Sequence, residues 1–214
     1  MSEERAENKN VGKMEVRAIE GGARKQQMYQ LFVLGQLMFM PVHGYVLRDI
    51  LSNMLGPFRQ MSWGALYPLI RQLERDELIE LDVESSEDEG KREANSRQRK
   101  RYRITEAGRK RFQAMMQEPD EYTADTPELF MIKLVNFKYV SPELRLAILQ
   151  HYLGYLQIAD NYVQMQRRRK ESYIGIDLQY VIRGVYYRLN TVQAELQWVE
   201  QEIARVAGEG EQAT

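Results

Sequence analysis

The sequence contains no cysteine and only two histidines, and these absences exclude several kinds of site. Without cysteine there are no disulfides, thiolate metal sites, cysteine nucleophiles or thiol redox sensors. His43 and His151 lie far apart in the chain and offer little material for a metal site or for histidine-based catalysis. Carboxylates are plentiful, but no pair stands out. We therefore expect no catalytic residues, no metal and no other cofactor.

Long hydrophobic runs are also missing. No stretch approaches the about 18 consecutive apolar residues of a membrane span. The N-terminal segment MSEERAENKNVGKMEVRAIEGG is polar, mixed in charge and without the apolar region of a secretion signal. We expect a cytoplasmic protein with no membrane partner.

The net charge is only −1, but the charges are unevenly placed. The span from Lys91 to Arg111 holds ten Lys or Arg against two Glu, a net charge of +8, whereas the rest of the chain carries −9. Phosphate groups are bound by a local patch, so this cluster matters more than the sum. The span is a candidate surface for a polyanion.

Apolar periodicity predicts three helices in the first third of the chain. Residues 25–40 are apolar nearly all round, which is typical of a buried helix, and residues 43–55 have a broad apolar face that includes Tyr45. In residues 62–79 an apolar stripe leaves the opposite side free, and Ser62 is placed to cap the helix. The second and third helices form a helix-turn-helix. The stripe consists of Leu66, Leu69, Ile70, Leu73 and Leu78.

A β-hairpin is predicted after these helices. Tyr102 and Ile104 alternate with Arg101 and Arg103, which gives a strand over 99–104 with one cationic side, and residues 78–83 are its partner. The polar segment between them is a long tip. Thr105 is placed to cap the following helix. A docked helix beside a cationic hairpin suits a phosphate backbone.

The remaining sequence predicts a short helix over 127–140 and two long helices. Ser141 caps the first long helix, which runs to about residue 170, and Asp177 caps the second. Apolar residues of the last helix recur at nearly heptad spacing, which indicates pairing with another helix, most economically at a dimer interface. This seam consists of Leu178, Val181, Val185, Leu189, Val192, Leu196, Val199 and Ile203.

The predicted fold is mainly α, with an N-terminal winged helix-turn-helix that has a two-stranded wing, followed by long coiled-coil-like helices. We expect a flexible arm at 1–24, a DNA-binding domain at 25–119, a helical dimerisation domain at 127–206 and a flexible tail at 207–214.

Three motifs occur in a familiar order: HGYVL at 43–47, SWGALYPLIRQLERDELI at 62–79 and RKRYRITEAGRK at 99–110. With them the chain resembles the PadR family of winged-helix transcriptional regulators, of the phenolic-acid-regulator type with the larger C-terminal helical domain. The resemblance implies a homodimer that places two recognition helices in the major grooves of a pseudo-palindromic operator, most often as a repressor. Two positions depart from the family: Glu77 stands where Gly is usual, and Ala65 where Thr is usual.

The expected partner is double-stranded DNA, and Tyr67 is the foremost candidate in the recognition helix because its hydroxyl can bond to phosphate while its ring packs on sugar. Each candidate has a competing interpretation. Tyr67 could simply pack against the protein, and Trp63 could anchor two helices to each other. Arg71 could lie on a solvated face. The candidate DNA-binding residues are Ser62, Trp63, Ala65, Tyr67, Pro68, Arg71, Arg97, Arg99, Lys100, Arg101 and Arg103.

The C-terminal helices carry many aromatic residues, for which two interpretations stay open. The rings either pack in the interface, which we favour, or stack on a small aromatic effector. A different class of function, a protein-interaction adaptor that no longer reads DNA, is disfavoured by the cationic wing. The aromatic set is Tyr152, Tyr155, Tyr162, Tyr173, Tyr180, Tyr186, Tyr187 and Trp198.

Overall fold

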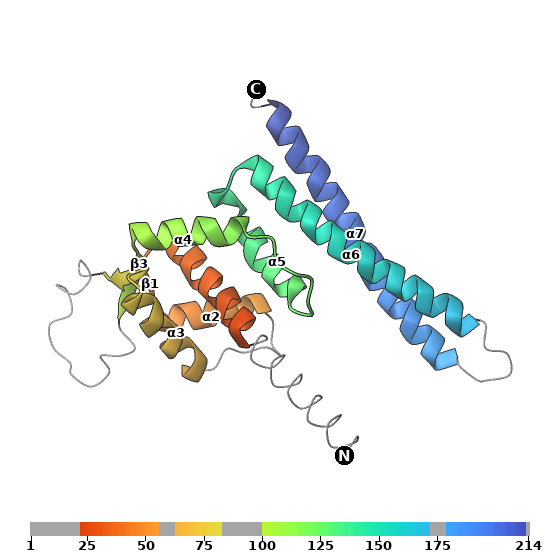
Figure 1. The fold of residues 1–214 in the computed structure, drawn as a ribbon, viewed down its shortest axis with the longest axis horizontal. Helices are drawn as coiled ribbons and strands as arrows, with labels where there is room; N and C mark the ends of the chain where they lie inside the picture. The colour runs from red at the N-terminus through yellow and green to blue at the C-terminus, as the bar shows by residue number, and fades with distance from the viewer. Residues whose placement is uncertain (1–21, 56–62, 83–99, 172–178, 213–214) are drawn as a thin grey trace, which may run out of the picture. The chain divides into compact units, whose positions relative to one another are not determined.

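The structure is a computed structural model that describes residues 22–55, 63–82, 100–171 and 179–212 (Figure 1). The chain divides into two compact units, Met1–Met116 and Gln117–Thr214, which are described separately. The fold is mainly helical with one small antiparallel sheet, which confirms the predicted class. Among the described helices, none has the length and apolar character needed to cross a membrane.

The first unit is built on a buried helix over residues 22–39. Phe32 and its neighbours are fully buried, as the continuous apolar run predicted. Residues 22–24 belong to this helix and not to the expected flexible arm. The helices α2 (Gly44–Leu55), α3 (Trp63–Arg75) and α4 (Glu106–Gln117) follow, and α2 and α3 pack together as a helix-turn-helix. The stripe of α3 is at most 5% exposed at Leu66, Leu69, Ile70 and Leu73.

The sheet has three strands in the order β1-β3-β2, with β1 at Val42–His43, β2 at Ile79–Leu81 and β3 at Arg101–Ile104. The hairpin β2-β3 is the predicted wing. The strand β1 was not predicted, because two residues are too few to show a period-two pattern. It pairs with β3 through Val42 opposite Tyr102.

The prediction that Tyr45 lies in the core is wrong. The residue is 44% exposed, and its ring stacks on that of His43 with 5.5 Å between centroids. The short strand β1 ends at His43 and α2 begins at the next residue, so Tyr45 falls in the first turn, outside the buried face of α2.

Helix α3 ends in a Schellman turn that has glutamate at the position usually taken by glycine. Leu78 N–H donates to the carbonyl of Leu73 (2.9 Å), and Glu77 N–H donates to that of Glu74 (3.2 Å). The φ of Glu77 is 56°, a left-handed value that costs a residue with a side chain roughly 1 kcal/mol. The turn keeps the usual geometry and carries local strain.

This turn is fastened to the start of α4. Thr105 Oγ1 accepts a hydrogen bond from Gly108 N–H (3.0 Å), which confirms the predicted cap, and donates one to the carbonyl of Glu77 (2.7 Å). Thr105 N–H donates to the carbonyl of Leu78 (3.1 Å). Gly108 is buried so close to this carbonyl that no side chain fits between them.

The second unit comprises α5 (Thr126–Val135), a 3-10 turn η2 (Phe137–Tyr139), α6 (Pro142–Glu171) and α7 (Gln179–Gln212). The predicted helix over 127–140 stops at Val135, where the Asn136 side chain donates to the carbonyl of Ile132 (2.8 Å). Ser141 caps α6 as predicted, its Oγ accepting from Leu144 N–H (3.4 Å).

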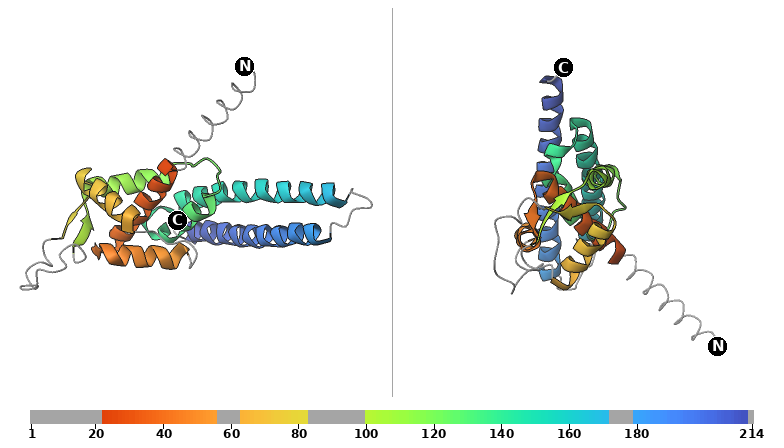
Figure 2. Two further views of the ribbon diagram at one scale, coloured as in Figure 1. Left: turned by 90° about the horizontal axis from the view of Figure 1, so that it is seen from below. Right: turned by 90° about the vertical axis from the view of Figure 1, so that its left-hand side faces the viewer.

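Helices α6 and α7 run side by side as an antiparallel hairpin (Figure 2). The seam of α7 is its more buried side: Leu189 and Val199 are buried, and Val185, Val192, Leu196 and Ile203 are half-buried. Packing within the chain therefore accounts for the periodicity that we had assigned to an interface between two copies. Val181 is exposed, and Leu178 lies outside the described residues.

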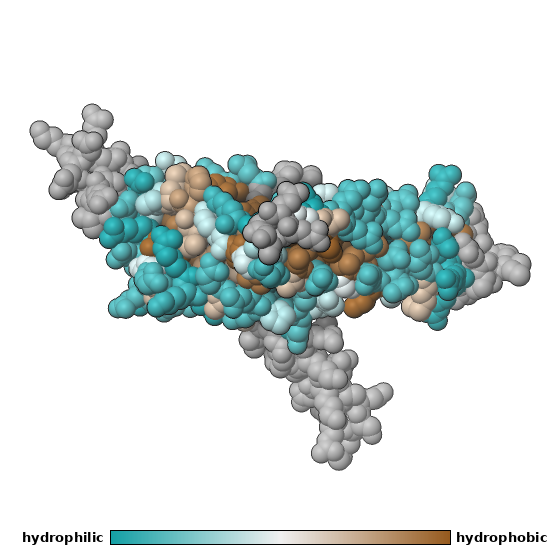
Figure 3. All heavy atoms as spheres, turned by 90° about the horizontal axis from the view of Figure 1, so that it is seen from above, coloured by the Kyte–Doolittle hydropathy of each residue, from teal (hydrophilic) through white to brown (hydrophobic). Residues whose placement is uncertain are grey.

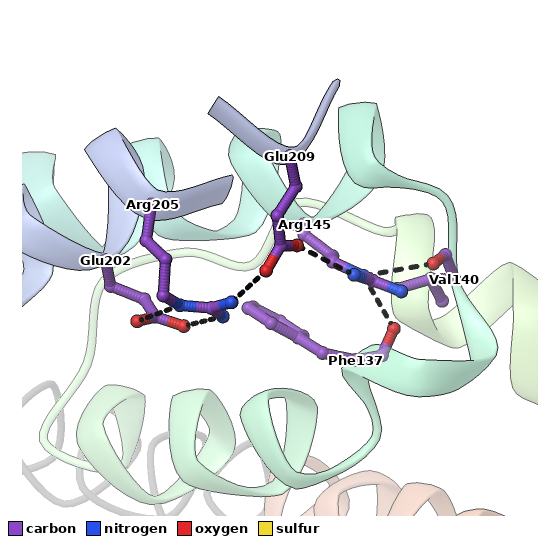
Figure 4. A network of polar contacts seen from close by, with 6 residues as sticks. All are labelled: Phe137, Val140, Arg145, Glu202, Arg205 and Glu209. Atoms are coloured by element: carbon purple, nitrogen blue, oxygen red, sulfur yellow. Dashed lines mark hydrogen bonds and ion pairs between the residues drawn. The ribbon is translucent and has the colours of Figure 1, made fainter. Parts of the chain in front are cut away.

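The end of α7 is held by charged side chains (Figure 4). Glu209 pairs with Arg205 one turn before it and lies 3.6 Å from Arg145 Nη1 of α6. Arg145 Nε also donates to the carbonyls of Phe137 (2.8 Å) and Val140 (3.2 Å). Helix α7 consequently continues to Gln212, beyond residue 207 at which we expected the chain to fray.

We expect Glu77→Gly to raise the free energy of unfolding by about 0.5–1 kcal/mol, because glycine adopts φ 56° without strain. Chemical denaturation measures the change. As a matched control, Glu74→Gly makes the same replacement inside α3 and should lower stability by about 1 kcal/mol. Equal losses in both variants would contradict the strain at Glu77.

Gly108→Ala should lower the free energy of unfolding by about 2 kcal/mol or more, because the added Cβ would overlap the Leu78 carbonyl oxygen and lie 2.7 Å from Ile104 Cγ1. Thermal and denaturant unfolding both report it. Gly208→Ala in α7, where an added Cβ meets nothing within 4 Å, should leave stability unchanged or higher.

Candidate nucleic-acid interface

The outward side of α3 carries the candidate residues that the stripe leaves free. Ala65, Pro68, Arg71 and Arg75 are exposed, whereas Tyr67 is half-buried at the edge of this side. Trp63 begins α3, but its side chain lies outside the described part of the structure, as does Ser62 altogether. The exposed side of α3 is thus small, and its two described cations are Arg71 and Arg75.

The helix and the wing meet at Tyr102 of β3. This phenol is 7% exposed, and its pKa is raised above the ordinary value by burial first and then by the nearby Glu74 and Tyr67. Arg71 acts on the same phenol in the opposite direction. Tyr67 and Arg71 of α3 therefore lie close enough to β3 to act on a buried phenol of the wing. Tyr67 is half-buried and also takes part in an interaction within the protein.

Arg101, a candidate for DNA binding, is engaged inside the protein. Its Nε donates to the Pro41 carbonyl (3.2 Å) and lies 3.3 Å from Asp82 Oδ2, whose side chain is 6% exposed. These contacts join the segment before β1 to the wing and balance a buried carboxylate. A structural role accounts for Arg101 without DNA.

Arg103 is also paired within the wing. Its Nε donates to Glu80 Oε1 (2.9 Å), and the two residues face each other across β2 and β3. Both side chains are about half exposed, so the pair is accessible to water and salt. A count of cations along the sequence did not reveal that Glu80 and Asp82 pair with these arginines. The alternation of the two acidic residues in the preceding predicted strand was the available signal.

Lys100, directly before β3, is exposed. Arg97 and Arg99 lie outside the described residues, so their placement stays a prediction. The described residues contain no group of His, Asp or Glu side chains suited to holding a metal ion. The site offers exposed cations and one half-buried tyrosine, side chains that can bind phosphate.

Residues 33–114 match the family model of the transcriptional regulator PadR-like family. The N-terminal module belongs to that family. The match begins within the first helix and continues through the helix-turn-helix and the wing strands into α4. It contains the three motifs at 43–47, 62–79 and 99–110 that carried the resemblance in the sequence. PadR-like proteins are transcriptional regulators and not enzymes, which confirms the expected class of function. A comparison with curated proteins gives no match.

Several solved structures are distantly similar over most of the chain. Bacillus subtilis PadR in complex with operator DNA is 14% identical, with 82% of this chain and 96% of that chain covered and a TM-score of 0.37. The same protein with p-coumaric acid is 14% identical, with 84% and 99% covered and a TM-score of 0.37. The Vibrio cholerae virulence activator AphA is 18% identical, with 85% and 99% covered and a TM-score of 0.35.

The raised pKa of Tyr102 predicts an alkaline loss of stability. The folded protein holds the phenolic proton more tightly than the unfolded chain, so this contribution is complete below the unfolded pKa of 10.0 and falls as pH rises above it. The denaturation midpoint should drop between about pH 9 and about pH 11. In Tyr102→Phe the drop should be smaller. An equal drop in both proteins would contradict the burial of this phenol.

Proposed function

We propose that the protein is a cytoplasmic homodimeric transcriptional repressor that binds a pseudo-palindromic operator. Residues 25–119 bind DNA and residues 127–206 dimerise. The observation that carries the proposal is the PadR-like match over a module whose α3 presents Arg71 and Arg75 on its exposed side. A helix docked by one face and cationic on the other suits insertion into a major groove.

In this mechanism each copy presents one α3 to DNA, and the helical units set the separation of the two recognition helices near one turn of DNA, about 34 Å. Arg71, Arg75 and Lys100 contribute salt-dependent phosphate contacts. Tyr67 adds a phosphate or sugar contact from the edge of α3, next to the wing. The exposed Ala65 and Pro68 lie along the same side and contribute shape rather than charge.

Release by a small aromatic effector is part of the proposal. In the second unit the rings of Tyr122, Tyr155, Tyr152, Phe130 and Trp198 contact one another in a row. This row supports packing as the main role of the aromatic residues. Its two ends are 42% and 44% exposed and offer ring faces on which a flat molecule can stack.

A salt series with random-sequence duplex DNA tests the surface. For the wild type, the logarithm of affinity should fall linearly with the logarithm of salt concentration. Arg71→Ala and Lys100→Ala should each weaken binding on every sequence and reduce the slope by about 1. Tyr67→Ala should weaken binding further on operator fragments captured from genomic DNA. Fluorescence anisotropy measures the DNA affinity of the wild type and of each variant.

Lys25→Ala is the matched control, because Lys25 is an exposed lysine on the first helix, outside α3, the wing and the cationic span from Lys91 to Arg111. Its slope should equal that of the wild type. If Lys25→Ala lowers the slope while Arg71→Ala and Lys100→Ala do not, the DNA-binding surface lies elsewhere. If the wild type shows no salt-dependent affinity, the adaptor function replaces the regulator.

A further inference from the structure

The hairpin of α6 and α7 has opposite charges at its two ends. At the distal end, where α6 finishes and α7 begins (Figure 1), residues 157–171 and 179–192 contain six Lys or Arg against two acidic residues, a net charge of +4. At the other end, residues 142–156 and 193–212 contain two Arg against six Glu, a net charge of −4. The distal end is therefore a second cationic region besides the wing.

The arginines at the two ends of the hairpin differ in their partners. At the acidic end, Arg145 and Arg205 both pair with Glu209 (Figure 4). At the distal end, Arg183 and Arg188 are exposed and form no ion pair with any residue that the structure describes. An anion that approaches these two guanidinium groups therefore competes with no carboxylate of the described chain.

Exposed tyrosines lie among the distal cations. Tyr180 and Tyr187 of α7 are 74% and 73% exposed, and Tyr162 of α6 is 53% exposed. The guanidinium carbon of Arg183 lies 5.7 Å from the centroid of the Tyr180 ring, so a cation and a ring are already adjacent. Exposed aromatic side chains that gather in one region indicate a binding surface more strongly than single ones do.

The distal residues of α7 share one side of the helix. Tyr180, Arg183, Gly184, Tyr187 and Arg188 are related by steps of three, four and seven residues and are all exposed, on the side away from the seam. A Cβ added at Gly184 would meet nothing within 4 Å. Since the two tyrosines are separated by roughly 10 Å along the helix axis, the gap at the glycine leaves room for a flat ring against either of them.

Tyr162 lies at the same level on α6. The Tyr152 hydroxyl donates to Glu195 Oε2 (2.7 Å), which fixes the level at which the two antiparallel helices meet. Ten residues further along α6 is Tyr162, and ten residues back along α7 is Val185, two positions from Tyr187. The distal tyrosines of the two helices therefore belong to one region.

This region, which we call the distal surface, combines rings with unpaired cations. Its members are Tyr162, Tyr180, Arg183, Tyr187 and Arg188. Hydrophobic surface, in brown, lies beside hydrophilic surface, in teal, on the face that Figure 3 draws. Tyrosine and arginine are also common in protein interfaces, but unpaired arginines in a region of net charge +4 favour a partner with many negative charges.

We propose that the distal surface binds single-stranded nucleic acid of any sequence. Arg183 and Arg188 bind phosphates, and the rings of Tyr180 and Tyr187 stack on bases. A duplex supplies phosphates but not base faces, because its paired bases stack on each other. The distal surface lies in the second unit and uses no residue of α3 or the wing, so this inference is independent of the proposed operator binding.

Fluorescence anisotropy of the full-length protein with a labelled oligothymidylate of about 12 nucleotides tests the proposal. The double variant Arg183→Ala with Arg188→Ala should lower the affinity about tenfold or more at low salt. It should also reduce the slope of log affinity against log salt by about 1.4, since each phosphate contact with a single strand contributes about 0.7.

Tyr187→Ala should lower the affinity for oligothymidylate about fivefold or more, because it removes a ring on which a base stacks. Tyr187→Phe keeps the ring and should bind like the wild type. Both variants should keep the wild-type affinity for random-sequence duplex DNA, which also shows that they are folded. Arg71→Ala should give the reverse pattern, with weaker duplex binding and unchanged binding of oligothymidylate.

Arg205→Ala is the matched control, because it removes an exposed arginine from the acidic end of the same helix. It should leave the affinity for oligothymidylate unchanged. If it lowers this affinity as much as the double arginine variant does, the distal surface is not the binding site.

Other outcomes also overturn the assignment. Unchanged affinity in Tyr187→Ala would show that the surface binds phosphate without bases. If the double arginine variant changes the oligomeric state in sedimentation equilibrium but not the affinity, the surface contacts protein instead. A wild type that binds oligothymidylate but no duplex removes the proposed function and leaves this inference standing, and the opposite result removes this inference alone.

Discussion

The first unit depends on the close approach of α4 to the turn that ends α3. The Leu78 carbonyl accepts from Thr105 N–H, and the absence of a side chain at Gly108 lets the first turn of α4 lie against it. Thr105 also caps α4 and holds the carbonyl of Glu77. The turn, the strand β2 and the helix α4 are therefore fixed together. Any displacement of α4 would move α3 and the wing as well.

The same constraint explains how much of this unit could be predicted from the sequence. The caps at Thr105 and Ser141 and the stripe of α3 follow from local residue chemistry, and all are present. The strand β1 and the exposure of Tyr45 depend on pairing with β3, sixty residues away, and no local pattern encodes that. The ion-pair partners of Arg101 and Arg103 depend on which residues of the two wing strands face each other. A count of cations along the sequence does not include this information.

Helix α7 shows a limit of a different kind. Its heptad-like seam predicted helix pairing, and α7 does pair, but with α6 of the same chain. Apolar spacing specifies that a face is covered and not which helix covers it.

The ion pairs within the wing have a consequence for electrostatics. Glu80 on β2 and Asp82 directly after it act as fixed counterions for Arg103 and Arg101, at distances of 2.9 and 3.3 Å. A phosphate that approaches these arginines competes with carboxylates whose local concentration does not change with the buffer. Fewer mobile ions are released than the number of wing cations suggests. Anion binding by the wing should therefore depend less on the salt concentration. The paired carboxylates also weaken the attraction of the wing for distant anions.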